Sequence, residues 1–278
     1  MINPMQLLTL FAADDIKVSL AAEQIFSLGP FTITNSHILG WIAAVLIGWF
    51  LLSGVKKIKV TSTGGITQFL EIAVDFVLWI LTPILGSRKA AVRFAPLFAT
   101  LFLFILLNNW MGLLPGVGKG IYISGDPLFR PLTADLNGTI ALALFGVVMV
   151  QVLSIRENGG LNHLKHYFGG NFKNPINIFV GVLEMFGELT RVISLSLRLF
   201  FNIMIGKILI TIFSVLGGVA APFTTLLFIV FELFVGLIQS YIFTMLCATY
   251  LGATMAHEDH HEEHEAAQPI TDLAEVKT

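Results

Sequence analysis

Charged residues are scarce in this 278-residue sequence: Asp, Glu, Lys and Arg make up 12% of it, whereas 55% is hydrophobic. Soluble domains average about 25% charged residues. A soluble fold could not cover this much apolar surface, so the composition excludes a water-soluble domain with a large core. Several uncharged runs of about 20 residues instead predict an all-α polytopic membrane protein embedded in the lipid bilayer.

Cysteine is almost absent as well. The single Cys247 excludes a disulfide framework or a cysteine metal site within the chain. Residues 1–13 are weakly apolar, but they lack the basic region that opens a secretory signal. We therefore expect residues 1–35 to form an external N-terminal segment, whose beginning is interfacial or disordered rather than a cleaved signal.

Five apolar stretches predict membrane-spanning helices. Turn signals such as Gly54, Pro115 and the Gly217-Gly218 pair separate them. Each stretch is long enough to cross about 30 Å of hydrocarbon. The predicted spans cover residues 37–53, 94–114, 137–155, 176–217 and 222–256, and they belong to one transmembrane domain, residues 36–256.

Residues 66–85 have a different pattern, in which Gln68, Glu71 and Asp75 alternate with large apolar side chains at helical spacing. This pattern is typical of an amphipathic helix that lies in the membrane interface. Basic clusters lie before it, around Lys57, and after it, at 88–93. The positive-inside rule places both clusters in the cytoplasm and the N-terminus outside.

The polar residues 257–278 should form a cytoplasmic tail. This segment is rich in His and Glu, and we expect a disordered solubilising tail rather than a metal site. His163 and His166, in a predicted cytoplasmic loop, are likewise expected to be solvated and not metal ligands.

The last two predicted spans are longer than the membrane is thick. A helix of 40 residues is about 60 Å long, roughly twice the hydrocarbon thickness. We therefore expect 176–217 and 222–256 to form a long, tilted hairpin. Arg198 lies in the middle of its first helix, with apolar residues on both sides. Placing a guanidinium there costs between about 2.5 and more than 10 kcal/mol, which favours a functional role.

The helical period groups the other polar residues of the hairpin around Arg198. Glu184, Glu188 and Asn202 project within about 80° of Arg198, and no acid lies three or four residues from it. Its counter-charge must therefore come from another helix or another chain. On the second helix of the hairpin, Glu232 and Gln239 align on one face.

Lys207 projects on the opposite face of its helix from Arg198. Lys207 and Glu232 are about equally far from the predicted turn, so we expect them to form an ion pair at one depth. The titratable groups thus fall into an internal cluster (Glu184, Glu188) and an external one (Lys207, Glu232). Two clusters that do not meet indicate two aqueous half-paths, which protons could connect only on a moving carrier.

A self-contained transporter or channel that binds an anion at Arg198 is the main alternative, although such proteins usually show paired broken helices. An intramembrane enzyme is a weaker one. Four features resemble subunit a of the F-type ATP synthase membrane sector, in its bacterial form. They are Ser194-Leu-Ser-Leu-Arg198-Leu-Phe-Phe-Asn202, Asn109-Trp-Met-Gly-Leu-Leu-Pro115, Thr133-Ala-Asp-Leu-Asn137-Gly-Thr139, and Glu232 followed by Gln239.

The resemblance implies that Arg198 is the essential stator arginine that meets the carboxylate of the rotating c-ring. It implies polar neighbours at Asn202, Gln239 and Asn109. Glu184, together with Glu188 of the internal cluster, would line the cytoplasmic half-channel, and Lys207 and Glu232 the external one.

The resemblance also implies a non-catalytic, proton-translocating subunit of the bacterial inner membrane, present once per complex. H⁺ is favoured over Na⁺ because it is the commoner transported ion. Its partners would be the c-ring and the peripheral-stalk b subunits, with no cofactor and no nucleic acid. This chain departs from the family pattern at three positions. The family usually has a small residue at the position of Phe201 and often Pro at that of Val192. At the position of Lys207 it usually has a titratable acid or His. We expect Glu232 and water to carry the external path, and Lys207 to tune it.

Overall fold

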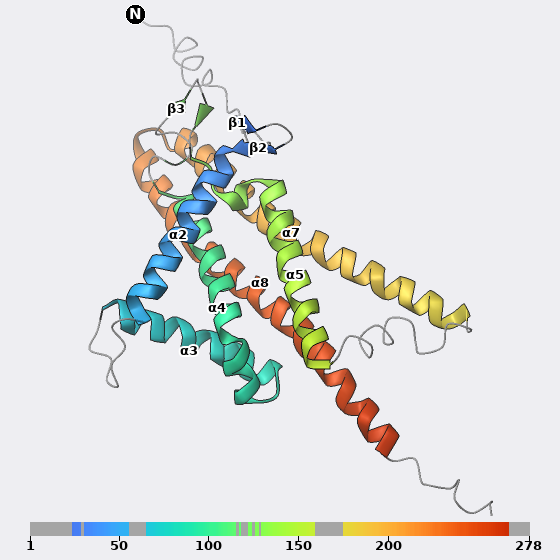
Figure 1. Cartoon of the computed structure of the whole chain (residues 1–278). Helices are drawn as coiled ribbons and strands as arrows, with labels where there is room; N and C mark the ends of the chain where they lie inside the picture. The colour runs from blue at the N-terminus through green and yellow to red at the C-terminus, as the bar shows by residue number, and fades with distance from the viewer. Residues whose placement is uncertain are drawn as a thin grey trace, which may run out of the picture. The chain divides into compact units, whose positions relative to one another are not determined.

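A computed structural model of the chain describes residues 24–28, 31–55, 65–114, 117, 122–123, 126–127, 129–158 and 175–266. Long helices make up most of the described chain (Figure 1). They are α2 (Asn35–Val55), α3 (Ile66–Ile84), α4 (Arg88–Met111), α5 (Leu136–Asn158), α7 (Pro175–Leu216) and α8 (Ala221–Ala266).

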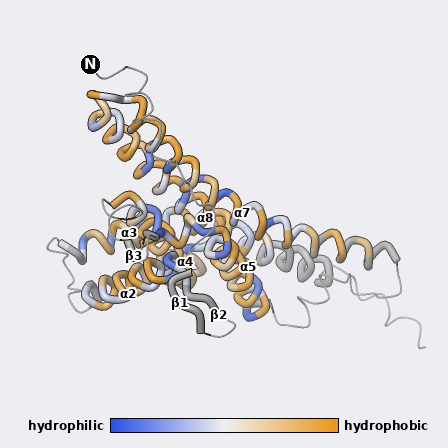
Figure 2. Tube along the Cα trace, turned by 90° about the horizontal axis from the view of Figure 1, so that it is seen from above, coloured by the Kyte–Doolittle hydropathy of each residue, from blue (hydrophilic) through white to orange (hydrophobic). Residues whose placement is uncertain are grey.

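All six of these helices are long and apolar enough to cross a membrane. Hydrophobic residues dominate most of their length (Figure 2). The membrane part of the fold is therefore all-α and polytopic, as the composition predicts. Because a helix satisfies its own backbone hydrogen bonds, it can lie in lipid without polar partners.

Helix α3 is the one for which the sequence predicts an interfacial position. Glu71 and Asp75 are exposed on it, whereas Ala73, Val77 and Leu81 are buried. This two-sided pattern agrees with an amphipathic helix. The length and composition of α3 also suit a span, so its interfacial position stays a prediction.

Strands occur in the described residues only as two short hairpins. Strands β1 (Gln24–Leu28) and β2 (Phe31–Thr34) pair antiparallel directly before α2, with a register shift between Gln24 and Phe26. Strands β3 (Tyr122–Ile123) and β4 (Asp126–Pro127) form the second hairpin, ahead of the 3-10 turn η1 (Leu132–Ala134). The β1–β2 hairpin lies within residues 1–35, the predicted external N-terminal segment, for which no strands were predicted.

Two helix ends differ from the sequence-based limits. Helix α4 begins at Arg88, so its first turns carry the basic cluster that was expected to precede the span. Helix α8 continues to Ala266, and the first part of the predicted disordered tail is therefore helical. The interpretations of residues 1–13, 56–59, 163–166 and 267–278 lie outside the described residues.

Helices α7 and α8 form the predicted hairpin. The 3-10 turn η2 (Gly218–Ala220) joins them, and Gly218 adopts a φ of +51°, which glycine tolerates at little cost. The Thr224 hydroxyl donates a hydrogen bond to the Phe213 carbonyl at 3.1 Å, and the Phe213 and Phe228 rings stack with centroids 4.0 Å apart. These contacts fix the level at which α8 runs back along α7.

The described chain divides into two compact units. The first contains the described residues up to Glu71, together with Thr100–Ala143 and Ile193–Phe243. The second contains Ile72–Ala99, Leu144–Val192 and the residues from Thr244 onward. Arg198, Lys207 and Glu232 belong to the first unit, whereas Glu184 and Glu188 belong to the second.

Candidate functional site

Arg198 lies on an exposed face of α7 that is mostly apolar, with Ser194 as its other exposed polar residue. Leu197, Phe201 and Ile205 share this face and are 36%, 51% and 54% exposed, and the Arg198 side chain is exposed as well. A long apolar face with one charge in it is not a surface for water. It suits contact with lipid or with another protein chain.

Arg198 makes no hydrogen bond or ion pair with any other residue that the structure describes. This agrees with the absence of an acid one turn away in the sequence. A guanidinium carries five N–H donors, no acceptor and a permanent charge. Its charge therefore has no counter-charge in contact within the described chain.

The opposite face of α7 holds the helix in the first unit. Leu195, Leu199 and Ile203 are 3% exposed or less. Between them, the buried Ser196 hydroxyl lies 3.3 Å from the Thr139 hydroxyl of α5. This packing fixes the rotation of α7 about its axis, and with it the direction in which Arg198 points.

Glu232 packs against a glycine of the neighbouring helix. Its carboxylate lies over Gly206 of α7, so closely that a Cβ atom at Gly206 would overlap it. Only a residue without a side chain leaves this space. Glu232 is 6% exposed despite its charge, which makes it a buried acid between two long helices.

The predicted ion pair between Lys207 and Glu232 is not formed as a contact in the described structure, where no N···O separation between them is within 4.0 Å. Lys207 and Glu232 nevertheless lie at the same level of the hairpin, because Glu232 meets Gly206, the residue next to Lys207. One helical step turns the Lys207 side chain by about 100° from Gly206. Lys207 instead lies within electrostatic range of both Glu232 and the buried Arg130.

Asn109 and Trp110 attach the end of α4 to α8 beside Glu232. The Asn109 Nδ2 atom donates to the Gly236 carbonyl at 3.3 Å, and the Trp110 indole donates to the Leu233 carbonyl at 3.1 Å. A Cβ atom at Gly236 would lie 3.2 Å from the Asn109 Cβ atom. The resemblance implies that Asn109 is a polar neighbour of Arg198. In the structure, Asn109 contacts α8 at Gly236, one turn from Glu232.

Asn202 and Gln239 each bury an amide nitrogen without a hydrogen-bond partner in the described chain. Gln239 is 6% exposed and Asn202 is half-buried. Buried polar atoms are nearly always hydrogen-bonded in proteins, to water if not to protein. These two amides mark positions along the hairpin at which a polar partner from outside the chain would fit.

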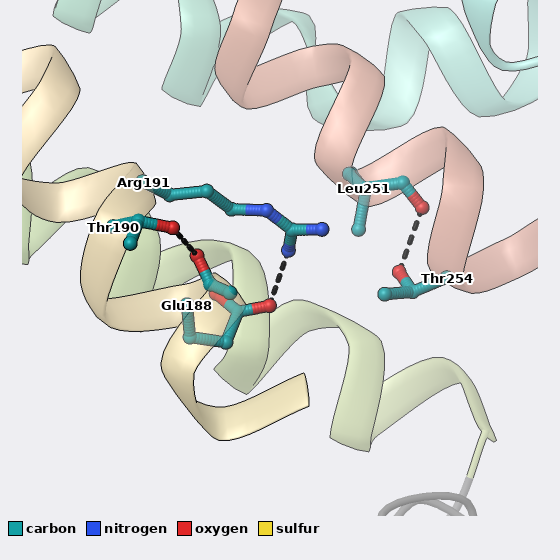
Figure 3. Close-up of polar contacts among 6 residues, drawn as sticks. Glu188, Thr190, Arg191, Leu251 and Thr254 are labelled. Carbon is teal, nitrogen blue, oxygen red and sulfur yellow. Dashed lines mark hydrogen bonds and ion pairs between the residues drawn. The ribbon is translucent and has the colours of Figure 1, made fainter. Parts of the chain in front are cut away.

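In the second unit, Glu188 is already paired. The Arg191 guanidinium donates to the Glu188 carboxylate one turn before it on α7, and its Cζ atom lies 4.5 Å from the centre of the Tyr250 ring on α8. Figure 3 shows Arg191 reaching from α7 toward the turn of α8 that carries Leu251 and Thr254. The spacing of Glu188 and Arg191 could have predicted this pair. Glu184 lies on α7, but its side chain is outside the described ones.

Three residues of this region were not predicted from the sequence. Gly206 has no side chain, so only its packing against Glu232 shows its role. Arg130 is a charged residue just before the Thr133–Thr139 motif, and this position could have indicated it. Asp135 lies within the motif and is 3% exposed, but its partner is distant in the sequence.

The fold and site together define a class: polytopic helical membrane proteins that carry charged residues within long apolar helices. The family described as "ATP synthase A chain" matches residues 37–252. An ATP synthase subunit a of Gloeobacter violaceus is 33% identical, over 88% of this chain and 94% of its own length. Subunits a of Myxococcus xanthus and Moorella thermoacetica are 33% and 31% identical, over 87% and 82% of this chain and 80% and 94% of their own lengths.

The chain belongs to the ATP synthase A chain family. It is a multi-pass bacterial membrane protein and a non-catalytic subunit of the membrane sector of that complex. Its processes are therefore ATP synthesis and ion transport, as the resemblance implies.

Proposed function

We propose that the chain is the stator proton channel of a rotary ATP synthase, with Arg198 as the fixed cation between two half-channels. The observation that supports this most directly is the exposed Arg198 on an apolar face, without a partner in the described chain. Because its charge is permanent and costly in lipid, another chain must supply the counter-charge. A carboxylate on a rotating c-ring would do so.

The two half-channels would be lined by the two groups of titratable residues. Lys207 and Glu232 would line the external path, and Glu184 and Glu188 the cytoplasmic one. The polar neighbours of Arg198 would be Asn109, Asn202 and Gln239. Arg198 cannot carry a proton itself, because a guanidinium does not release one in proteins. It can hold a passing carboxylate in its ionised form and repel cations from a direct route.

The same proposal includes the partners of the chain and its orientation in the membrane. The exposed apolar face around Arg198 would meet the c-ring, and peripheral-stalk b subunits would hold the chain still, with one copy per complex. The basic cluster at the start of α4 supports a cytoplasmic position for that end, by the positive-inside rule. The N-terminus would then be external, the C-terminus cytoplasmic, and the transported ion H⁺.

Cysteine cross-linking tests the proposed ring contact. Leu197→Cys and Phe201→Cys place a thiol on the exposed face beside Arg198, whereas Leu195→Cys places one on the buried face of the same turn. With the buried Cys247 replaced by Ala, the first two variants should cross-link to a c subunit that carries a cysteine next to its carboxylate. Equal cross-linking of Leu195→Cys, or none from either exposed position, would contradict the proposal.

Activity of the isolated chain separates the stator from a transporter. Helix α7 runs unbroken through Arg198, whereas transporters build their sites from discontinuous helices. The chain should therefore purify together with a small two-helix proteolipid ring and a stalk subunit. It should not transport ions when it is reconstituted alone, and transport by the isolated chain would favour the transporter.

A further inference from the structure

Four side chains of the first unit form a continuous series of hydrogen bonds around the start of α2. The His37 Nδ1 atom lies 2.6 Å from the Thr34 hydroxyl, which lies 2.8 Å from the Ser36 hydroxyl. Ser36 in turn lies 3.0 Å from Oδ2 of Asp135, at the start of α5. His37 is half-buried, whereas Ser36 and Asp135 are 0% and 3% exposed. The series therefore leads from a partly accessible histidine to a buried carboxylate.

Counting hydrogens shows what this series can do. Three links need three hydrogens, but the two hydroxyls, of Thr34 and Ser36, supply only two. The third must be carried by the His37 Nδ1 atom or by the Asp135 carboxyl. With the proton on His37, every link donates toward Asp135. With the proton on Asp135, every link donates toward His37, and both arrangements satisfy all three bonds.

Moving between these two arrangements transfers one proton from end to end. Nδ1–H gives its hydrogen to Thr34, Thr34 gives its own to Ser36, and Ser36 gives its own to the Asp135 carboxylate. When the transfer starts from the imidazolium form of His37, each hydroxyl gains and loses one hydrogen and nothing is oxidised or reduced. The net result is a neutral imidazole and a protonated carboxyl. The Thr34 backbone N–H lies 3.4 Å from Nδ1 and donates to it, which fits the arrangement in which Nδ1 is an acceptor.

We propose that His37, Thr34, Ser36 and Asp135 form a proton relay that feeds the external half-channel. This inference rests on the proposed function, because it needs an external proton path. Histidine suits the accessible end, since imidazole exchanges protons readily near neutral pH. The relay assigns a transport role to the start of α2, which the sequence analysis left outside the site.

Arg130 connects the inner end of the relay with the Lys207–Glu232 region. The Arg130 side chain donates to the Ala134 carbonyl at 2.8 Å, directly before Asp135. Arg130 also acts electrostatically on Lys207, which is coupled to Glu232 in the same way. Arg130 thus links the segment that carries Asp135 with Lys207 through an electrostatic interaction.

A purely structural role for Asp135 is the competing explanation. Its Oδ1 atom accepts the Asn137 backbone N–H at 3.2 Å, so Asp135 also caps α5. Asn caps helices about as well as Asp, but an amide cannot take up a proton. Asp135→Asn therefore keeps the cap and removes the relay.

The first experiment measures ATP synthesis by the whole complex in proteoliposomes, driven by an imposed K⁺ diffusion potential. Asp135→Asn should lower the rate at least about tenfold, on the scale of a lost proton-transfer group, while the complex assembles normally. Ser154→Ala is the matched control, because this serine of α5 is as fully buried as Ser36 and lies outside the relay. A wild-type rate for Asp135→Asn would overturn the relay.

The second experiment uses chemical rescue, which does not depend on Asp135→Asn folding. His37→Ala should slow synthesis, and added imidazole should restore the rate by substituting for the missing ring. Imidazole should leave the wild type and Ser154→Ala unchanged. A His37→Ala defect that imidazole does not relieve would mean that His37 only supports the fold. The Leu197→Cys cross-link tests the proposed function separately, so a cross-link with an intact rate in both variants refutes the relay alone.

Discussion

Arg191 and Arg198 lie about two turns apart on the same helix, and their environments are opposite. Arg191 pairs with Glu188 and lies over the Tyr250 ring. Arg198 is exposed among apolar side chains and has no partner within the described chain. Both carry a cation that lipid disfavours. The chain itself stabilises one of them and leaves the other to be stabilised from outside.

This difference separates structural charges from functional ones. A charge that is satisfied within the chain stabilises packing, and its loss costs a modest amount of free energy. A charge without a partner does not stabilise the isolated chain, so we expect it to be stabilised by a partner that takes part in the function. Glu232 is intermediate between these cases, because it is buried over Gly206 and interacts electrostatically with Lys207 without an ion-pair contact.

The largest effect should come from Arg198→Ala. We expect proton-driven ATP synthesis by the reconstituted complex to fall by about a hundredfold or more, as for other preorganised charges at reacting centres. ATP hydrolysis by the soluble head should remain measurable, because the substitution does not touch that head. Arg191→Ala, tested in parallel, is the matched cation. Near wild-type synthesis in Arg198→Ala would show that Arg198 is no more important for coupling than the paired Arg191.

Gly206→Ala should have the next largest effect. Its new methyl group would overlap the Glu232 carboxylate, so that side chain must move out of its place between α7 and α8. We expect proton pumping to fall by about tenfold, less than the hundredfold or more that the loss of a proton-transfer group costs, because Glu232 is displaced and not removed. Gly48→Ala in α2 is the control, because a Cβ atom there meets nothing within 4 Å. An active Gly206→Ala enzyme would show that the position of Glu232 does not matter.

Local periodicity explains which parts of the site could be predicted from the sequence. The long hairpin and the common depth of Lys207 and Glu232 follow from helix length and one turn. The predicted contact between those two side chains was wrong, because the Glu232 carboxylate occupies the space over Gly206 instead. No pattern in the sequence specifies which residue of α7 faces α8 at that level.

Contacts between distant segments could not be predicted either, because no sequence pattern specifies which elements pack together. Asn109 and Gly236 are 127 positions apart, and Ser36 and Asp135 are 99 apart. A helical period assigns a residue to a face, but it does not say which element covers that face. The missed Glu188–Arg191 pair is different, because its spacing alone indicates the contact.

Lys207 offers a smaller and graded test. Lys207→Ala removes one unit of charge near Glu232, and Lys207→Glu changes the local charge by two. If Lys207 tunes the external path, both variants should shift the pH profile of ATP-driven pumping, and Lys207→Glu should shift it further. Lys89→Ala removes an exposed lysine at the start of α4 and serves as the control. An unchanged profile in both variants would remove Lys207 from the mechanism.

The smallest effect should come from Arg191→Ala, the satisfied counterpart of Arg198. It removes an ion pair and a cation–π contact that together are worth about 1–2 kcal/mol, so the thermal unfolding temperature of the complex should fall slightly. Tyr250→Leu should cause part of the same loss, because it removes the cation–π contact and leaves the Glu188–Arg191 ion pair. Coupled synthesis should remain close to the wild-type rate, because Arg191 already has its counter-charge inside the chain. If Arg191→Ala abolished synthesis as completely as Arg198→Ala, having a partner within the chain would no longer distinguish a structural cation from a functional one.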